Sequence, residues 1–446
     1  MAEPQHLLGK LSLKDLTIHD STGRFQLSPA LPDTEVSQFV LSQNGVAWKG
    51  SLTTDQYYLR EKVLGNTQAY KRSGTDEING SWRFILRDLS ISLDSDSRNN
   101  DILETYNVVS SLELLVRDAH RIKATGKATV ELLKVKTGCI GSVYTFENQR
   151  KKGYARMLVD LLNDWSRKFL NHCDKDDDNY SFNTMYSEIG EYYAKNHYIS
   201  RHVPWINIPL NGSFDNANKE SSFEVALIDK GGFEELVKKS NEYDQLKFIK
   251  LCTEETQQGI NNVRLFLDFN VSSVDCLHER AAFYNKYLND SQPLKFGLNL
   301  TRKTEEGEEE IVGFIIWTYN FNDQDIEVLK IGCFISETSD DKAIYDADLE
   351  EQVYKILILE MLKYVGGALD SVRFAKGIKI WQTSISSEVL QRNTFRNWII
   401  EELRGKLDLP NEESLSAITS FNDSDQSLIE QNKGLIWEAN EKWAWF

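Results

Sequence analysis

Cysteine is scarce in this sequence and shows no paired spacing. Five cysteines are spread over 446 residues, and no CxxC pair occurs. An odd number of widely separated cysteines excludes a disulfide framework and a cysteine zinc site. It favours reduced thiols in a reducing compartment.

Long apolar runs are also missing. No stretch approaches the roughly 20 apolar residues that a membrane-spanning helix needs. The first residues include Lys10, Lys14 and Asp15, which do not fit the apolar segment of a secretory signal. We therefore expect a cytoplasmic protein with no membrane partner.

Basic residues are outnumbered by acidic ones. The chain has 51 Lys and Arg against 68 Asp and Glu, a formal net charge of −17. Nucleic acid is therefore not expected as the main partner, because phosphate binding needs a basic face. An acidic surface would attract a cationic small substrate such as an amine, although it also simply keeps a protein in solution.

The length and composition predict two folded domains. A chain of 446 residues exceeds one ordinary core, and 41% hydrophobic with 11% aromatic residues is ample for packing. In the first half, hydrophobic patterning predicts strands at 82–89, 139–145 and 182–186, a short amphipathic segment at 103–115, and helices at 157–169 and 187–195. In the second half it predicts strands at 263–269, 294–302, 311–319, 328–336 and 378–383, and a helix at 349–365. The order strand, strand, strand, helix, strand recurs, which suggests two similar lobes, although many α+β domains share it.

A basic, glycine-containing turn joins the strand at 139–145 to the following helix. Gly153 in the sequence RKKGYA (150–155) allows a close backbone approach, and Ala155 is the next-smallest choice. A helix start offers free N–H groups and a partial positive charge, so this turn is suited to a pyrophosphate. The local basic side chains are Arg150, Lys151, Lys152 and Arg156. The dinucleotide pattern GxGxxG and the pattern GxxxxGK[ST] are both absent, and a plain surface turn is the alternative.

Two motifs in order carry a family resemblance. The pattern Arg150-x-x-Gly153-x-Ala155 between strand and helix resembles the coenzyme A loop of GNAT N-acetyltransferases. About forty residues later, Tyr192 to Tyr198 (YYAKNHY) resembles the second signature of that superfamily, with Asn196 and His197 in place of the usual Leu-Gly. Further segments resemble the fungal lysine N6-acetyltransferase family: Trp48, LTTDQY (52–57), Arg60-Glu61, GSVYT (141–145), YSEIG (186–190) and GFIIW (313–317).

The resemblance implies an α+β fold in two parts. Residues 1–215 would form a GNAT acetyltransferase domain, a mixed central sheet flanked by helices, which holds acetyl-coenzyme A as cosubstrate. Residues 216–446 would form a second, degenerate GNAT-like lobe that shapes the acceptor site. Acidic residues at 337–341 stand where a cofactor loop would be, so we expect this second lobe to have lost cofactor binding.

The resemblance also implies roles for individual residues. The cofactor-binding set is Val143, Tyr144, Thr145, Arg150, Lys151, Lys152, Gly153, Tyr154, Ala155 and Arg156. Tyr193 matches the tyrosine that protonates the leaving thiolate, and packing is the alternative for this aromatic residue. Proton removal from the amine needs a base, because a lysine side chain is mostly protonated at pH 7. The candidates are Glu188 and Glu147, each of which could equally be a solvated carboxylate.

Three more residues are candidates for substrate binding. Glu61 could hold an ammonium group, and Arg280 could bind a substrate carboxylate in a bidentate manner, with His278 beside it. No metal site is expected, since Asp174 to Asn179 lacks the turn glycine of a calcium loop.

The sequence thus predicts acetylation of the ε-amine of free L-lysine by direct transfer in a ternary complex. Two alternatives remain open: an acetyltransferase for proteins, peptides or another small amine, and a non-catalytic coenzyme A-binding scaffold. The sequence leaves the acceptor, the base and the oligomeric state undetermined.

Overall fold

The fold is known from a computed structural model of the whole chain. It describes residues 12–32, 34–67, 78–92, 105–126, 129–171, 179–210, 223–288, 293–304, 307–334, 346–367 and 375–445. Most of the calcium-like stretch, the expected boundary at 215/216 and the acidic segment 337–341 lie outside these ranges.

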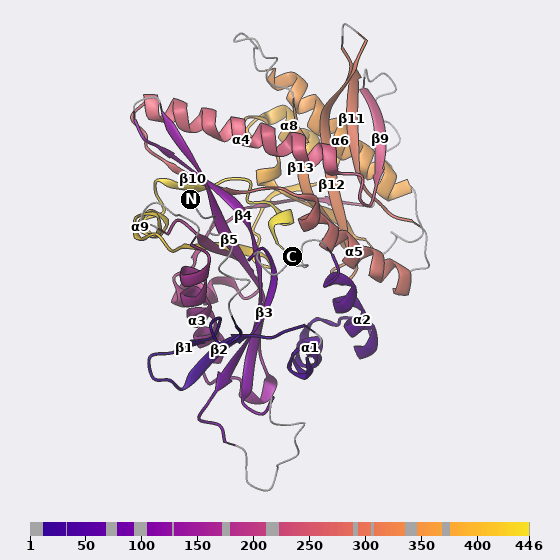
Figure 1. Ribbon diagram of the computed structural model, residues 1–446. Coiled ribbons are helices and arrows are strands. Elements are labelled where there is room, and N and C mark those ends of the chain that lie inside the picture. Colours follow the sequence, from indigo (N-terminus) through magenta and orange to yellow (C-terminus); the bar gives the residue numbers. More distant parts are fainter. Residues whose placement is uncertain are drawn as a thin grey trace.

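The α-helices and strands alternate along the chain (Figure 1). The helices are α1 Glu35–Trp48, α2 Thr54–Leu64, α3 Tyr154–Phe169, α4 Glu234–Gln257, α5 Val271–Leu288, α6 Ala347–Gly367, α7 Ser387–Leu390, α8 Asn393–Asn397 and α9 Asp423–Glu430. The strands are β1 Ile18–His19, β2 Phe25–Pro29, β3 Gly80–Asp88, β4 Val108–Ala124, β5 Val130–Thr145, β6 Phe182–Ser187, β7 Ile199–Ser200, β8 Trp205–Pro209, β9 Phe223–Asp229, β10 Val263–Leu267, β11 Lys295–Lys303, β12 Glu309–Asn320, β13 Asp325–Cys333, β14 Gly377–Trp381, β15 Lys406–Leu409, β16 Leu415–Ser420 and β17 Leu435–Trp437.

The first sheet is built around two long antiparallel strands. Its order is β1-β2-β3-β4-β5-β6-β16-β7, with β10 and β17 joined at the far end of β4. The prediction of a short amphipathic segment at 103–115 is wrong, because residues 108–124 form the central strand β4. Both faces of this strand are buried, and its buried side chains include polar ones such as Ser110 and Glu113, so the sequence lacks the apolar–polar alternation of a half-exposed strand.

Helices cover the two faces of this sheet. On one face, apolar side chains of α3 pack on β3, β4 and β5, around the fully buried Trp165. On the other face, Val36 and Val40 of α1 pack against Ile85 and Tyr144. Helix α2 begins with a capping box, in which the Thr53 hydroxyl accepts the N–H of Gln56 and the Gln56 side chain accepts the N–H of Thr53.

The second sheet has the order β15-β8-β14-β13-β12-β11-β9. Each sheet takes a strand from the other half of the sequence: β8 pairs with β14 in the second sheet, and β16 pairs with β6 in the first. The expected division at 215/216 stays a prediction, and this exchange of strands joins the two lobes across it. Figure 1 shows α4 lying across the upper part of the molecule, and its residue Phe248 packs on Ile122 and Phe266 of the first sheet.

The two lobes share one local design. In β5 an extra residue at Ser142–Val143 lies opposite Leu112, and the parallel pairing with β6 ends just before it, at Ile140 and Met185. In β13 an extra residue, Leu329, marks a register shift against β12, and the parallel pairing with β14 ends just before it, at Glu327 and Lys379. A long helix follows in each case, α3 or α6. The predicted similarity of the lobes is therefore confirmed at the level of topology.

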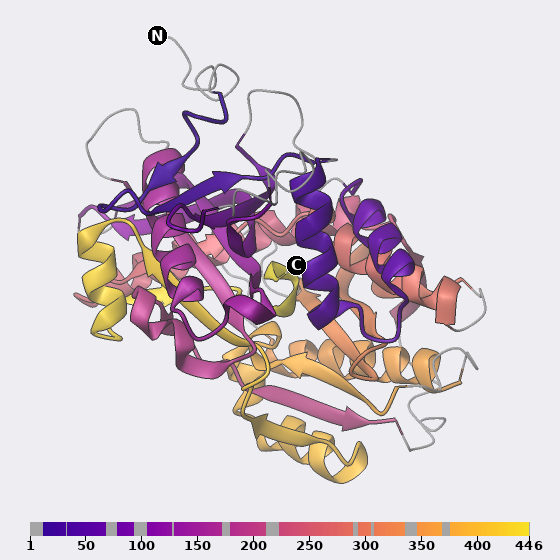
Figure 2. The same cartoon turned by 90° about the horizontal axis from the view of Figure 1, so that it is seen from below.

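The last described residues lie between the lobes, near the centre of both views (Figures 1 and 2). Residues 439–445, called here the C-terminal segment, include the fully buried Trp443. Helix α2 also contacts the second lobe, where the Arg60 guanidinium donates to the Tyr284 hydroxyl at 2.8 Å. Among the described helices, none has the length and apolar character needed to cross a bilayer.

Candidate active site

The candidate site centres on the opening between β5 and β6. Beyond Ile140 and Met185, β5 continues to Thr145 while β6 ends at Ser187, and no pairing joins them. The bulge places Ser142 at φ 51°, in the left-handed region. A bulge disrupts the ladder and leaves backbone groups unpaired, so the predicted residues Val143 to Thr145 edge a gap in the sheet.

The predicted cofactor loop leads from this opening into α3. Gly153 precedes the first helical residue with φ 83° and ψ 5°, and no side chain caps the helix start. A Cβ added to Gly153 would meet nothing within 4 Å, so the glycine is required by its backbone conformation and faces open space. Lys151 also has a positive φ of 63°. These features leave the first N–H groups of α3 available to an anion.

Charged side chains surround this loop. Arg150, Lys151, Lys152 and Arg156 are all exposed. Arg150 donates to the Tyr144 hydroxyl at 3.3 Å and to the Thr145 carbonyl oxygen at 3.3 Å. The Lys152 ammonium donates to Gln149 Oε1 at 2.8 Å, and Arg156 lies 3.7 Å from Asp160 on the helix surface. The loop is thus a local cation cluster on an acidic chain.

The loop is anchored from behind. The Tyr154 hydroxyl donates to Asp88 at 2.8 Å, and Arg24 holds the same carboxylate with two hydrogen bonds of 3.0 and 2.7 Å. The predicted role of Tyr154 is therefore limited to its backbone, because its side chain points inward. These hydrogen bonds, that of Arg24 first, lower the pKa of Asp88 well below its usual value.

The second motif forms a 3-10 helix, Gly190–Asn196, beside α3. His197 ends it with φ 67°, the left-handed conformation for which relatives use glycine. The buried Asn196 side chain donates to the Arg156 carbonyl at 3.0 Å and to Asp160 at 2.6 Å. The two departures from the family pattern therefore preserve the turn and tie it to the cofactor helix.

Tyr193 and Glu188 lie together at the end of β6. Tyr193 is 8% exposed, and within the described chain its hydroxyl has no hydrogen-bond partner. Burial raises the pKa of Tyr193, and the charges of Tyr192 and Glu188 add to the shift. Glu188 reaches solvent, yet desolvation raises its pKa; the charge of Lys442 opposes that shift and the charge of Asp323 reinforces it.

The other predicted carboxylates have different surroundings. Glu147 is exposed in a 3-10 turn after β5, on the side of the cofactor loop and away from the bulge. Glu61 lies on α2 and pairs with Arg60 at 2.6 Å, so its charge is already neutralised. Of the two proposed bases, only Glu188 is brought near Tyr193.

A functional candidate that sequence reasoning missed is Glu113 on β4. It lies beside the bulge, where the Ser142 hydroxyl donates to it at 3.4 Å, and Arg83 binds its other oxygen at 2.6 Å. Burial alone would lower the pKa of Arg83, but the charges of Glu113 and Glu61 outweigh it and raise that pKa. An acidic residue inside an apolar stretch (SSLELLV, 110–116) was the available signal.

His278 does not reach the opening. It is 1% exposed in the core of the second lobe, between Phe233 and Phe296, with Nε2 3.0 Å from the Trp317 carbonyl oxygen. Burial lowers its pKa to about 3. Arg280 is half-buried on the same helix, α5. This placement argues against substrate binding by His278.

The C-terminal segment approaches the opening from the second lobe. Tyr186 comes just after Met185, the last residue of β6 that pairs with β5, and its hydroxyl donates to Asn440 at 3.3 Å. The Lys442 ammonium pairs with Glu327 at 3.2 Å and lies 3.7 Å from the Trp445 ring centre. Among the described residues, no group of three or more His, Cys, Asp or Glu could hold a metal ion.

Three kinds of comparison place this chain among known proteins. It is 33% identical over 188 residues to the uncharacterized protein YGR111W of Saccharomyces cerevisiae; the match covers 39% of this chain and only 43% of that relative. A probable N-acyltransferase from Enterococcus faecalis is similar in structure at 8% identity, covering 91% of this chain and 74% of its own, with a TM-score of 0.47. A tandem GNAT protein from the clavulanic acid biosynthesis pathway aligns at 10% identity over 90% of this chain and 100% of its own, also with a TM-score of 0.47.

The family model described as the LYC1 GNAT-like C-terminal domain matches residues 210–446. The match includes the whole second sheet except β8, together with the C-terminal segment. Because it spans more than half of the chain, the chain belongs to the LYC1 GNAT-like family, within the GNAT superfamily of N-acetyltransferases.

Proposed function

We propose that this protein transfers the acetyl group of acetyl-coenzyme A directly to the ε-amine of free L-lysine. The observation that carries the proposal is the combination, in one opening, of a bulged strand, an uncapped helix start and the Tyr193 hydroxyl, which has no hydrogen-bond partner among the residues that the structure describes. The first two are suited to an acyl thioester that also carries a pyrophosphate, and the third is suited to proton transfer.

The residues around the opening fit acetyl-coenzyme A. Gly153 faces open space, so the backbone of residues 151–155 can approach a pyrophosphate without a side chain between them. The exposed cations Arg150, Lys151, Lys152 and Arg156 are within reach of the same anion. When bound, acetyl-coenzyme A supplies an acetyl thioester. Backbone N–H groups at the Ser142–Val143 bulge can donate to a carbonyl oxygen there.

Two side chains divide the proton transfers. Tyr193 keeps its proton because burial raises its pKa, so it can donate to a departing thiolate. Glu188 accepts the proton of the acceptor ammonium group, directly or through a water. Desolvation raises its pKa above the ordinary glutamate value, which makes this carboxylate a stronger base than an ordinary one. Glu113 is bound by Arg83 and contacts the Ser142 hydroxyl, so we assign it to positioning the bulge.

The cationic acceptor follows from the surrounding charge. The net charge of −17 attracts an amine over distance. Glu188 and Asp323, from different lobes, contribute negative charge at the opening, and their mutual repulsion is part of the raised pKa of Glu188. The family resemblance points to lysine among cationic amines.

The test incubates the purified protein with acetyl-coenzyme A and with single amino acids or lysine-containing peptides as acceptors. It measures the free thiol of coenzyme A that is released when the acetyl group is transferred. We expect release with L-lysine, and a loss in kcat of about 100-fold or more for Tyr193→Phe, the usual scale of a lost acid catalyst. Tyr192→Phe is the matched control, since Tyr192 is the half-buried neighbour and should retain activity. Release with peptides alone would move the acceptor to proteins. Binding of coenzyme A with no release to any amine would favour a non-catalytic scaffold.

A further inference from the structure

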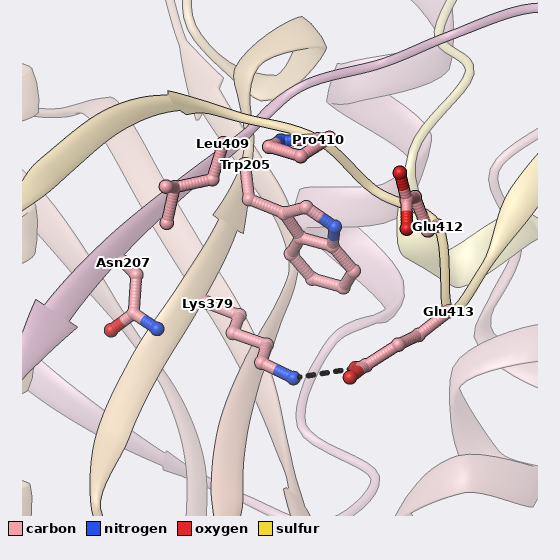
Figure 3. Close-up of a pocket in the computed structure, with 7 residues that line it drawn as sticks. All are labelled: Trp205, Asn207, Lys379, Leu409, Pro410, Glu412 and Glu413. Carbon is pink, nitrogen blue, oxygen red and sulfur yellow. Dashed lines mark hydrogen bonds and ion pairs between the residues drawn. The ribbon is translucent and has the colours of Figure 1, made fainter.

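A pocket of about 240 Å³ lies on the second lobe, outside the cofactor opening. Its lining residues come from β8, β14 and the chain that leaves β15: Trp205, Asn207, Lys379, Leu409, Pro410, Glu412 and Glu413. Figure 3 shows the Trp205 ring in the middle of this group, with Lys379 and Glu413 facing each other below it. This volume is below the 300–1,000 Å³ of drug-sized sites, so it suits a ligand of amino-acid size.

The pocket contains an ion pair that a ligand can open. The Lys379 ammonium lies 2.9 Å from Asp325 and 3.2 Å from Glu413. The Asp325 side chain is 13% exposed, whereas that of Glu413 is 79% exposed and loses little when it moves away. A ligand with a carboxylate can take the place of Glu413 on Lys379. A neighbouring ammonium group on the same ligand would then bind the released Glu413.

The pocket sits on the acceptor side of the active site. Trp205 contacts Trp381 at a ring-centre distance of 5.4 Å, and Trp381 contacts Tyr186, at the opening, at 5.6 Å. The chain that forms the pocket rim continues directly into β16, where Leu415 pairs with Ser187, the residue before Glu188. Lys379 and Glu188 also share an electrostatic neighbour: both interact with the buried Lys442.

A second observation concerns the segment that forms the pocket rim. Asn411, between the lining residues Pro410 and Glu412, is 7% exposed. Neither its amide nitrogen nor its amide oxygen has a hydrogen-bond partner in the described chain. Buried polar atoms are normally paired, and such exceptions often mark a missing ligand or water.

We infer that this pocket holds the α-carboxylate and α-ammonium groups of a free amino acid acceptor, on Lys379 and Glu413 respectively. The inference rests on the proposed function and names the side chains that would distinguish a free zwitterionic amino acid from other amines. A lysine within a polypeptide lacks both charges and gains nothing from this pair. The long side chain of the acceptor is then directed toward the opening at Tyr186 and Glu188.

The experiment crosses two variants with three acceptors. L-lysine has both α groups, 1,5-diaminopentane lacks the carboxylate, and 6-aminohexanoate lacks the α-ammonium group. We expect Lys379→Gln to raise KM for L-lysine and 6-aminohexanoate about tenfold and to leave KM for 1,5-diaminopentane unchanged, as for a lost charged hydrogen bond. Glu413→Gln should raise KM for L-lysine and 1,5-diaminopentane alone. In both variants kcat should change little.

Two controls separate the possible outcomes. Lys376→Gln removes the same charge at an exposed position three residues earlier and should have no effect. Glu413→Gln alters a largely exposed side chain, so it tests the pocket even if Lys379→Gln fails to fold. If the unchanged protein acetylates L-lysine but both variants keep its KM for all three acceptors, the pocket assignment is refuted and the proposed function stands. If no amine is acetylated by the unchanged protein, the proposed function itself fails.

Discussion

Replacing Gly153 with alanine separates strain in the cofactor loop from loss of cofactor binding. Gly153 has φ 83°, and an added Cβ meets no protein atom within 4 Å. The only intramolecular cost is therefore the left-handed conformation, about 1–2 kcal/mol for an alanine. This should lower the Tm by a few degrees at most in a chain of this size.

The effect on acetyl-coenzyme A should be larger. The Cβ enters the space in front of the first N–H groups of α3, where we place the pyrophosphate. Loss of one hydrogen bond to a charged group costs about 1.5–3 kcal/mol, which corresponds to a Kd about 10–100-fold higher. Titration calorimetry with coenzyme A, beside thermal unfolding without ligand, measures the two effects separately.

Gly231 provides the matched control. It precedes α4 in the second lobe with φ 91°, and its added Cβ also meets nothing within 4 Å. Gly231→Ala should therefore cause the same small loss of stability and leave Kd for coenzyme A unchanged. Equal Kd values for both variants and the unchanged protein would refute the placement of the pyrophosphate at Gly153.

Three other predictions concern charged groups. Because the pKa of Glu188 is raised, the acid limb of the kcat/KM–pH profile should lie above the ordinary glutamate value of 4.5, and Glu188→Gln should abolish that limb. His278 has a pKa of about 3 in the fold, against 6.5 when unfolded, so protonation of the unfolded chain should reduce the unfolding free energy as pH falls from 6.5 toward 3. His278→Gln should flatten that pH dependence in urea titrations, and an unchanged slope would contradict its buried neutral state. Lys330→Met leaves the buried Glu441 without its counter-charge at 3.1 Å and should reduce stability by about 3–5 kcal/mol, whereas Lys303→Met, at an exposed pair, should cost less than about 1 kcal/mol.

The cofactor loop could be predicted from the sequence because its determinants are local. Gly153, the basic residues and the apolar spacing of 157–169 all lie within one short segment, and the structure forms strand, turn and helix there. Tyr193 and Glu188 were likewise located by a contiguous motif. Their proposed roles require the two side chains to lie close together. The charge of Glu188 contributes to the raised pKa of Tyr193, which supports this.

Other features depend on contacts between distant segments. Strand β4 is buried on both faces, so residues 108–124 lack the alternation that identifies a strand. Glu113 becomes notable only because Ser142 and Arg83 come from strands on either side of it. The pocket needs Trp205, Lys379 and Glu413, and Trp205 lies 174 residues before Lys379 and 208 residues before Glu413. No spacing rule brings such residues together.

The two bulges explain why only one lobe is expected to do the chemistry. In the first lobe the gap beyond Ile140 and Met185 leads to the uncapped start of α3. In the second, Glu441 binds Lys330, which directly follows the extra residue Leu329, and Lys442 binds Glu327, two residues before Leu329. Buried ion pairs of the C-terminal segment thus occupy the position beside the bulge of β13, whereas the equivalent position beside the bulge of β5 is open. Removing one partner of either ion pair would leave a buried charge without its counter-charge, so these pairs stabilise the closed arrangement of the second lobe. We therefore assign selection of the acceptor to the pocket on the outside of this lobe.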